Sequence, residues 1–166
     1  MTDFGRLLQT LAAADIRCAI IGGVAAVAHG AGRMTQDLDI VYDRSPDNLE
    51  LLANALRPLR PYLRGAPPGL PFLWDVLTLS RGLNFTLTTD AGDIDLFGEI
   101  VGGGTWADLL PHFESVSVYG QTIRVLSLRK LIEVKRAAGR PKDFEAIAEL
   151  ETLLEERDAG AGSIGE

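Results

Sequence analysis

The sequence predicts an α+β fold in which helices flank a mixed sheet of about five strands, with a pair of helices at the C-terminal end. Three patterns indicate it. Residues 17–21 form a short apolar run that ends at a glycine pair, which is typical of a buried strand. Apolar and polar residues alternate in 37–42 and in 83–97 with the two-residue period of strands. Apolar residues in 127–155 instead recur at helical spacing.

Local signals place the other elements. Phe4, Leu7, Leu8 and Leu11 have the spacing of one helix face. The pair Ser45-Pro46 is a typical helix start, because serine caps the first turn and proline is tolerated within it. We expect helices at residues 3–14, 24–29, 45–56, 106–110, 127–139 and 141–155, and hairpins at residues 83–97 and 116–125.

The chain length fits one domain. We expect a core at residues 1–126, with the helices of residues 127–156 packed on it in the same domain. Residues 157–166 are small and glycine-rich, which predicts a disordered tail. Residues 58–71 contain five prolines and are interpreted as an ordered loop or the edge of a lid. An interdomain linker is the alternative, although the segment that follows could not stand alone.

Composition bounds the class of protein. The chain has 166 residues, of which 46% are hydrophobic and 23% charged, as in ordinary globular proteins. The formal net charge of −7 argues against an extended electrostatic grip on nucleic acid, but not against a nucleotide or one RNA end bound through metal. Cys18 is the only cysteine, which excludes an intrachain disulfide. Because no signal peptide and no apolar run of about 20 residues is present, we expect a cytoplasmic protein without a membrane partner.

Asp37 and Asp39 are the first candidates for chemistry. A strand repeats every two residues, so both carboxylates project from one face and repel each other unless a cation lies between them. The alternative is a surface strand with solvated acids, which the apolar neighbours Leu38 and Ile40 disfavour.

Gly22 and Gly23 lie between the first strand and a short helix. Backbone amides at a helix start favour phosphate, and the missing side chain of Gly23 would let phosphate oxygens approach. An ordinary strand-to-helix turn is the alternative. Together with Asp37 and Asp39, the glycine pair predicts a site for a metal-bound nucleoside triphosphate.

These residues resemble the signature of the DNA polymerase beta-like nucleotidyltransferase superfamily. That signature is a glycine pair, a spacer of about a dozen residues and an Asp-x-Asp on a strand, as in Gly22-Gly23 and Asp37-Leu38-Asp39. The string from residue 21 to residue 39 is similar to small bacterial members related to AbiEii-type abortive-infection toxins. The resemblance extends from about residue 4 to about residue 154 and implies a minimal nucleotidyltransferase fold.

The hairpin at 83–97 supplies further acids. Asp93 and Asp95 share a face of its second strand, and Asp95 lies between two apolar residues. In the resembling superfamily a third acid arrives on such a strand, and Asp95 is the position that matches. Asp93 is nearer the turn and is more simply explained as a hairpin residue.

The resemblance implies two metal ions, Mg²⁺ or Mn²⁺, because two ions about 4 Å apart can clamp the attacking and leaving oxygens of a displacement. Asp37 and Asp39 would hold the ion that carries the triphosphate. Asp95 would hold the other ion and help to deprotonate the acceptor hydroxyl.

A basic segment follows in residues 135–143. Lys135, Arg140, Lys142 and Asp143 match a lysine and an Arg-x-Lys-Asp run that are common in the resembling family. Lys135 is expected to emerge towards the site and contact the triphosphate or the charge of the transition state. Arg140 and Lys142 are expected to bind the nucleotide, although Lys142 could equally be solvated. Asp143 could simply stabilise the start of the last helix.

Arg33 and Thr35 precede the acidic strand and are further candidates for nucleotide binding. Arg33 could bind phosphate oxygens or balance the acids as a structural ion pair, and Thr35 could be an ordinary turn residue. His29 at the end of a short helix is interpreted as structural. With two histidines and one cysteine in the chain, a zinc site is not expected.

The resemblance implies a metal-dependent nucleotidyltransferase that moves NMP from an NTP, such as ATP, to a hydroxyl of an RNA end such as tRNA, a protein or a small molecule. A toxin–antitoxin or phage-defence setting, with a cognate antitoxin or a homodimer as partner, also follows from the resemblance alone. The alternative is a catalytically inactive module that binds nucleotide or a partner. Simple phosphate hydrolysis is a third class, for which no water-activating group stands out.

Overall fold

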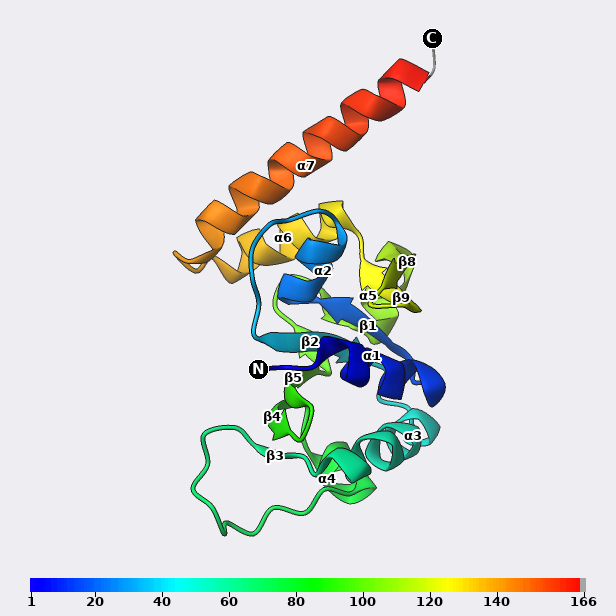
Figure 1. Ribbon diagram of the computed structural model, residues 1–166, viewed down its shortest axis with the longest axis vertical. Coiled ribbons are helices and arrows are strands. Elements are labelled where there is room, and N and C mark those ends of the chain that lie inside the picture. Colours follow the sequence, from blue (N-terminus) through cyan, green and yellow to red (C-terminus); the bar gives the residue numbers. More distant parts are fainter. Residues whose placement is uncertain (165–166) are drawn as a thin grey trace.

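The computed structural model describes residues 1–164 (Figure 1). In this part of the chain, seven strands form one mixed sheet in the order β3-β4-β5-β2-β1-β9-β8, and β6 and β7 form a separate pair. The strands are β1 Cys18–Ile21, β2 Asp37–Tyr42, β3 Tyr62–Leu63, β4 Asn84–Thr89, β5 Gly92–Phe97, β6 Glu99–Ile100, β7 Gly104–Thr105, β8 Phe113–Val118 and β9 Gln121–Leu126. The α-helices are α1 Phe4–Ala13, α2 Gly22–Ala28, α3 Pro46–Leu56, α4 Val76–Arg81, α5 Trp106–Leu109, α6 Leu128–Ala138 and α7 Asp143–Ile164.

The predicted α+β fold with a mixed sheet is confirmed, with seven strands rather than about five. The proline-rich segment contributes the unexpected strand β3, whose Tyr62 and Leu63 pair with Thr88 and Leu87 at one edge of the sheet. A sheet edge tolerates neighbouring prolines because one side of an edge strand needs no partner. At the other edge the hairpin β8–β9 joins the sheet through the parallel pairing of β9 with β1.

The pairing of β2 with β5 positions the acidic residues. The two strands are neighbours inside the sheet and run parallel, with Asp37 opposite Asp93 and Asp39 opposite Asp95. Side chains alternate between the two faces of a sheet, so all four carboxylates project from the same face. The apolar residues that alternate with them project from the other face and are fully buried: Leu38, Ile40, Ile94 and Leu96.

Helices lie against both faces of the sheet. Leu8 and Leu11 of α1 lie beside Ile20 and Ile40, so α1 covers the apolar face. Helix α2 begins directly where β1 ends and packs against β1, β2 and α6. No helix within residues 1–164 combines the length and the apolar character needed to cross a membrane.

The proline-rich segment continues into a long surface loop over residues 64–75 (Figure 1). Both ends of the loop are fastened. The Tyr62 hydroxyl donates a hydrogen bond to the Pro67 carbonyl at 2.5 Å, and the rings of Tyr62 and Phe72 pack in a T-shaped arrangement. The Trp74 indole donates to the carbonyl of Ala53 in α3 at 2.9 Å. The loop is therefore tied to β3 at one end and to α3 at the other.

Helix α7 corrects the expected C-terminal boundary. The sequence predicts a last helix ending near residue 155 and a disordered tail at 157–166, but α7 continues to Ile164 and extends away from the rest of the molecule (Figure 1). Residues 165–166 lie outside the described part. The glycines of this segment have low helix propensity, which misleads a local prediction. A tertiary contact supports the helix there, because Arg157 Nη2 donates to Nδ1 of the buried His29 at 3.2 Å.

Asn48 joins α3 to the ends of β1 and β2. It is fully buried. Its Oδ1 accepts from the Arg17 amide at 2.8 Å, and its Nδ2 donates to the carbonyls of Arg17 at 3.1 Å and Asp43 at 2.7 Å. The side chain thus satisfies three backbone groups that flank β1 and β2.

Replacing Asn48 with alanine should lower the free energy of unfolding by about 2 kcal/mol or more, because each buried polar group left without a partner costs about 1–3 kcal/mol. Urea unfolding followed by circular dichroism measures the loss. Asn54→Ala is the matched control on the exposed side of the same helix. It should change stability by less than about 0.5 kcal/mol, and equal losses in the two variants would contradict the role of Asn48.

Candidate functional site

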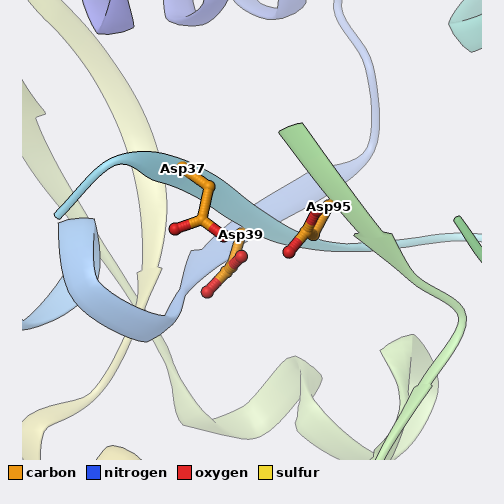
Figure 2. A group of neighbouring side chains, drawn as sticks. All are labelled: Asp37, Asp39 and Asp95. Atoms are coloured by element: carbon orange, nitrogen blue, oxygen red, sulfur yellow. The ribbon is translucent and has the colours of Figure 1, made fainter. Parts of the chain in front are cut away.

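Three carboxylates from two strands converge on one face of the sheet (Figure 2). Asp37 and Asp39 come from β2 and Asp95 from β5, and one oxygen of each lies within 4.8 Å of the others. The in-register pairing of Asp39 with Asp95 produces this convergence. Three carboxylate oxygens at such separations could hold a metal ion.

Asp39 is the electrostatically unusual member of the three. Its Oδ1 is buried and has no hydrogen-bond partner among the described residues. Burial, and then the nearby charges of Asp37 and Asp95, raise the pKa of Asp39 to about 8. Burial also raises the pKa of Asp95, although Arg64 opposes that rise. A buried oxygen without a partner and a set of hard oxygen donors fit a divalent cation such as Mg²⁺.

The glycine pair is required by the protein's own side chains. Gly22 has a φ of +69°, and a Cβ on it would lie 2.2 Å from Asp39 Oδ2. A Cβ on Gly23 would lie 2.6 Å from Thr35 Oγ1, and that hydroxyl donates to the Asp37 carbonyl at 3.2 Å. Phosphate contact is therefore not needed to explain these glycines. They let Asp39 and Thr35 pack directly against the start of α2.

Lys135 of α6 faces the site region. It lines a cavity of about 130 Å³ together with Gly23 and Thr35. Burial lowers the pKa of Lys135, while the charges of Asp143 and Asp39 oppose the decrease. The structure therefore places Lys135 at this cavity, and its contact with a triphosphate stays a prediction.

Arg33 is engaged with the C-terminal helix. Its guanidinium lies 3.1 Å from Glu145 Oε2 and 3.4 Å from Glu149 Oε2, both on α7. Of the two alternatives left open by the sequence, the structure has the ion pair. The partners are glutamates of α7 instead of the acids on the sheet, which no local pattern could reveal.

Arg140 and Lys142 lie in the turn between α6 and α7 and are exposed. Arg140 donates two hydrogen bonds to the buried carboxylate of Asp143, at 2.7 and 3.2 Å. This pair holds the start of α7, where an acid is favourable. The structure therefore places Arg140 in a structural contact and leaves Lys142 at the surface.

Arg64 is the residue of this site that sequence reasoning missed. Its Nη2 donates to Asp95 Oδ1 at 2.7 Å. Its Nη1 lies 3.6 Å from Asp37 Oδ2 and its Nε lies 3.4 Å from Asp93 Oδ2. Locally, the sequence shows only a basic residue inside a proline-rich segment. The contact of Arg64 with the acids could not be predicted from this, because it depends on how β3 pairs with β4.

Comparisons with known proteins bear on the fold. No protein-family model and no curated protein sequence matches the chain. Among solved structures, it is similar to a "putative nucleotidyltransferase" from Thermotoga maritima, with a TM-score of 0.56 and 17% sequence identity over 91% of this chain and 89% of that one. The chain has a nucleotidyltransferase-like fold. In this nucleotidyltransferase-like fold, the three aspartates occupy the centre of the sheet.

Gly22→Ala should destabilise the protein and displace Asp39, because the new Cβ would overlap Asp39 Oδ2. Gly120→Ala is the matched control, since Gly120 has a similar φ of +77° but nothing within 4 Å of an added Cβ. The control should cost about 1 kcal/mol in unfolding free energy from backbone strain alone. Urea unfolding of both variants measures the difference, and equal losses would refute the close packing of Asp39 on Gly22.

The raised pKa of Asp39 predicts a pH dependence. The folded, metal-free protein keeps a proton on Asp39 up to a pKa of about 8, whereas an aspartate in the unfolded chain loses it near about 3.9. The contribution of Asp39 to stability is thus complete at low pH and is lost as the pH rises towards 8. Asp39→Asn, which mimics the neutral carboxyl, should remove that loss.

Urea unfolding in a metal chelator, at several pH values between about 5 and 9, measures this difference. The stability of the wild type should decline relative to Asp39→Asn as the pH increases. Parallel pH profiles for the two proteins would contradict the raised pKa.

Proposed function

We propose that the chain is a metal-dependent nucleotidyltransferase, which transfers NMP from an NTP to a hydroxyl acceptor and releases pyrophosphate. The observation that supports it best is the convergence of Asp37, Asp39 and Asp95 beside the glycine pair, on a nucleotidyltransferase-like fold. A cluster of acids with a buried oxygen that lacks a partner is costly for the protein alone. A bound cation would offset the repulsion between the carboxylates and would coordinate the buried oxygen.

Asp37, Asp39 and Asp95 would hold Mg²⁺ or Mn²⁺, because these ions prefer carboxylate and phosphate oxygens. When bound, the ion would orient the triphosphate and neutralise charge on the leaving pyrophosphate. The three carboxylates fix the position of the ion and would thereby determine where the triphosphate binds.

The residues near these three carboxylates would contact the substrate. Gly22 and Gly23 would present backbone amides to the phosphates. Lys135 lines a cavity with Gly23 and Thr35 and would contact the triphosphate or the charge that develops during transfer. Thr35 would support Gly23 from behind. Gly23, Thr35 and Lys135 line one cavity, and Gly22 packs directly against Asp39.

Other basic residues are further candidates for nucleotide contact, and Arg33 lines the same cavity as Lys135. Arg33 and Arg140 could bind the nucleotide only by giving up their ion pairs with the α7 glutamates and with Asp143. Lys142 is exposed and could reach a phosphate without breaking such a contact.

Asp95 is also the candidate acceptor for the proton of the attacking hydroxyl. Arg64 binds its Oδ1, so Oδ2 is the oxygen that can take the proton. Burial raises the pKa of Asp95 from that of a free aspartate, which makes the carboxylate a better base.

The acceptor would be an RNA end such as that of tRNA, a protein or a small molecule in the cytoplasm. The net charge of −7 disfavours a long RNA partner. The resemblance of the glycine and aspartate motif to AbiEii-type proteins supports a toxin–antitoxin or phage-defence role, with an antitoxin or a second copy of the chain as partner. That setting rests on similarity of motif and fold.

One observation favours a second candidate, a catalytically inactive module of the same fold that binds nucleotide or a partner. Arg64 already contacts Asp37, Asp93 and Asp95. A guanidinium on these acids could stand in permanently for metal and leave only a binding function.

Nucleotide transfer separates the two candidates. The protein is incubated with Mg²⁺ or Mn²⁺, each labelled NTP, and bulk tRNA or cell extract. Label should pass to a macromolecular or small-molecule acceptor with the wild type, and Asp39→Asn should reduce transfer by at least about a hundredfold, because the triphosphate would lose its anchor. Binding of NTP without transfer to any acceptor would favour the inactive module.

Lys135→Ala is expected to reduce transfer by about ten- to a hundredfold. Lys130→Ala is the matched control, because Lys130 lies on the same helix but pairs with Glu133. Comparable activity in these two variants would argue against a role for Lys135 at the site.

A further inference from the structure

Arg64 reaches the acidic face of the sheet from the β3 edge. It contacts Asp95, Asp37 and Asp93 at 2.7, 3.6 and 3.4 Å. Among the described residues no ion pair joins it to Asp39, the remaining carboxylate on this face. One guanidinium therefore serves three of the four aspartates.

The position of Arg64 does not depend on the acids alone. Its amide donates to the Thr86 carbonyl at 3.0 Å, and its Nη2 donates to the Leu87 carbonyl at 2.7 Å as well as to Asp95. The side chain is 27% exposed. Two bonds to the backbone of β4 make Arg64 a fixed part of the sheet edge, unlike a surface arginine that moves freely with solvent.

The acidic face is thereby divided into two zones. In one zone Arg64 contacts Asp37, Asp93 and Asp95. In the other, Asp39 packs on Gly22 and keeps a buried Oδ1 without a partner. Two-metal sites place their two ions about 4 Å apart, so a second ion would have to lie close to the carboxylates that Arg64 contacts. In this protein the Arg64 guanidinium already donates a hydrogen bond to Asp95, the carboxylate that a second ion would need.

We propose that Arg64 is a built-in counter-cation that takes the place of a second metal ion, so that the site binds one divalent ion, held by Asp39 together with Asp37 and Asp95. The ion itself rests on the proposed function. The count differs from the two ions that the sequence resemblance implies. Arg64 is a positioning residue here: it fixes Asp95 Oδ1 through one charge-assisted hydrogen bond from Nη2, and it leaves Oδ2 to the ion or to the acceptor proton.

The proposal is tested by the number of Mn²⁺ ions bound per chain. The protein is titrated with Mn²⁺, and the electron paramagnetic resonance signal of free Mn²⁺ gives the amount that is not bound. The wild type should bind one ion. Arg64→Ala should bind two, because four carboxylates would remain with no resident cation. Arg64→Lys keeps a positive charge and should bind one. Arg60→Ala is the matched control from the same segment, since Arg60 pairs with Asp90 away from the acidic face, and it should bind one.

Arg64→Gln is a second neutral variant, which keeps a longer, polar side chain at this position in case Arg64→Ala does not fold. It carries no charge, so it should also bind two ions. Circular dichroism establishes that each variant is folded before the titration. A purely structural role for Arg64 would alter stability in both variants without adding a metal ion.

Two Mn²⁺ ions in the wild type, or a single ion in both Arg64→Ala and Arg64→Gln, would overturn the proposal and leave the metal centre itself intact. No Mn²⁺ bound by the wild type would instead refute the metal centre of the proposed function. In that case a gain of one ion in Arg64→Gln would still support the counter-cation, and no gain would overturn it.

Discussion

The parallel, in-register pairing of β2 with β5 is the constraint on which the candidate site depends. It sets Asp37 against Asp93 and Asp39 against Asp95, although like charges on paired strands destabilise a sheet. The buried leucine and isoleucine residues on the opposite face hold the strands together in spite of this repulsion. Two features reduce the repulsion between the carboxylates. The Arg64 guanidinium is shared among three of them, and burial raises the pKa of Asp39 so that it retains a proton.

The turn from β1 into α2 is adapted to the same constraint. Asp39 stands opposite Ile21 at the end of β1, so the first residue of α2 meets the carboxylate directly. Glycine at position 22 is the only residue that leaves this space to Asp39 and accepts the left-handed backbone conformation. The acid, the strand pairing and the start of the helix therefore form one packing unit.

Much of this arrangement could be predicted from the sequence, because it follows from short-range periodicity. Alternation in β2 and β5 places Asp37, Asp39 and Asp95 on strand faces, and the resemblance joins the two strands. Long-range contacts could not be predicted in this way. Nothing local indicates that Arg64 returns to Asp95, or that Arg33 pairs with glutamates on α7. The last helix exceeds its predicted length for the same reason, since the contact of Arg157 with His29 joins distant parts of the chain.

The contiguous segment from β3 to β5 has a consequence for how the chain acquires its structure. β3 pairs with β4 and β4 with β5, so this meander carries Arg64 together with Asp93 and Asp95. β2 lies further back in the sequence, and its docking closes a longer loop, which is slower and entropically more costly. If the meander forms first, it meets β2 with its own acids already partly neutralised. The sequence order of these strands would then lower the electrostatic barrier to the final association step.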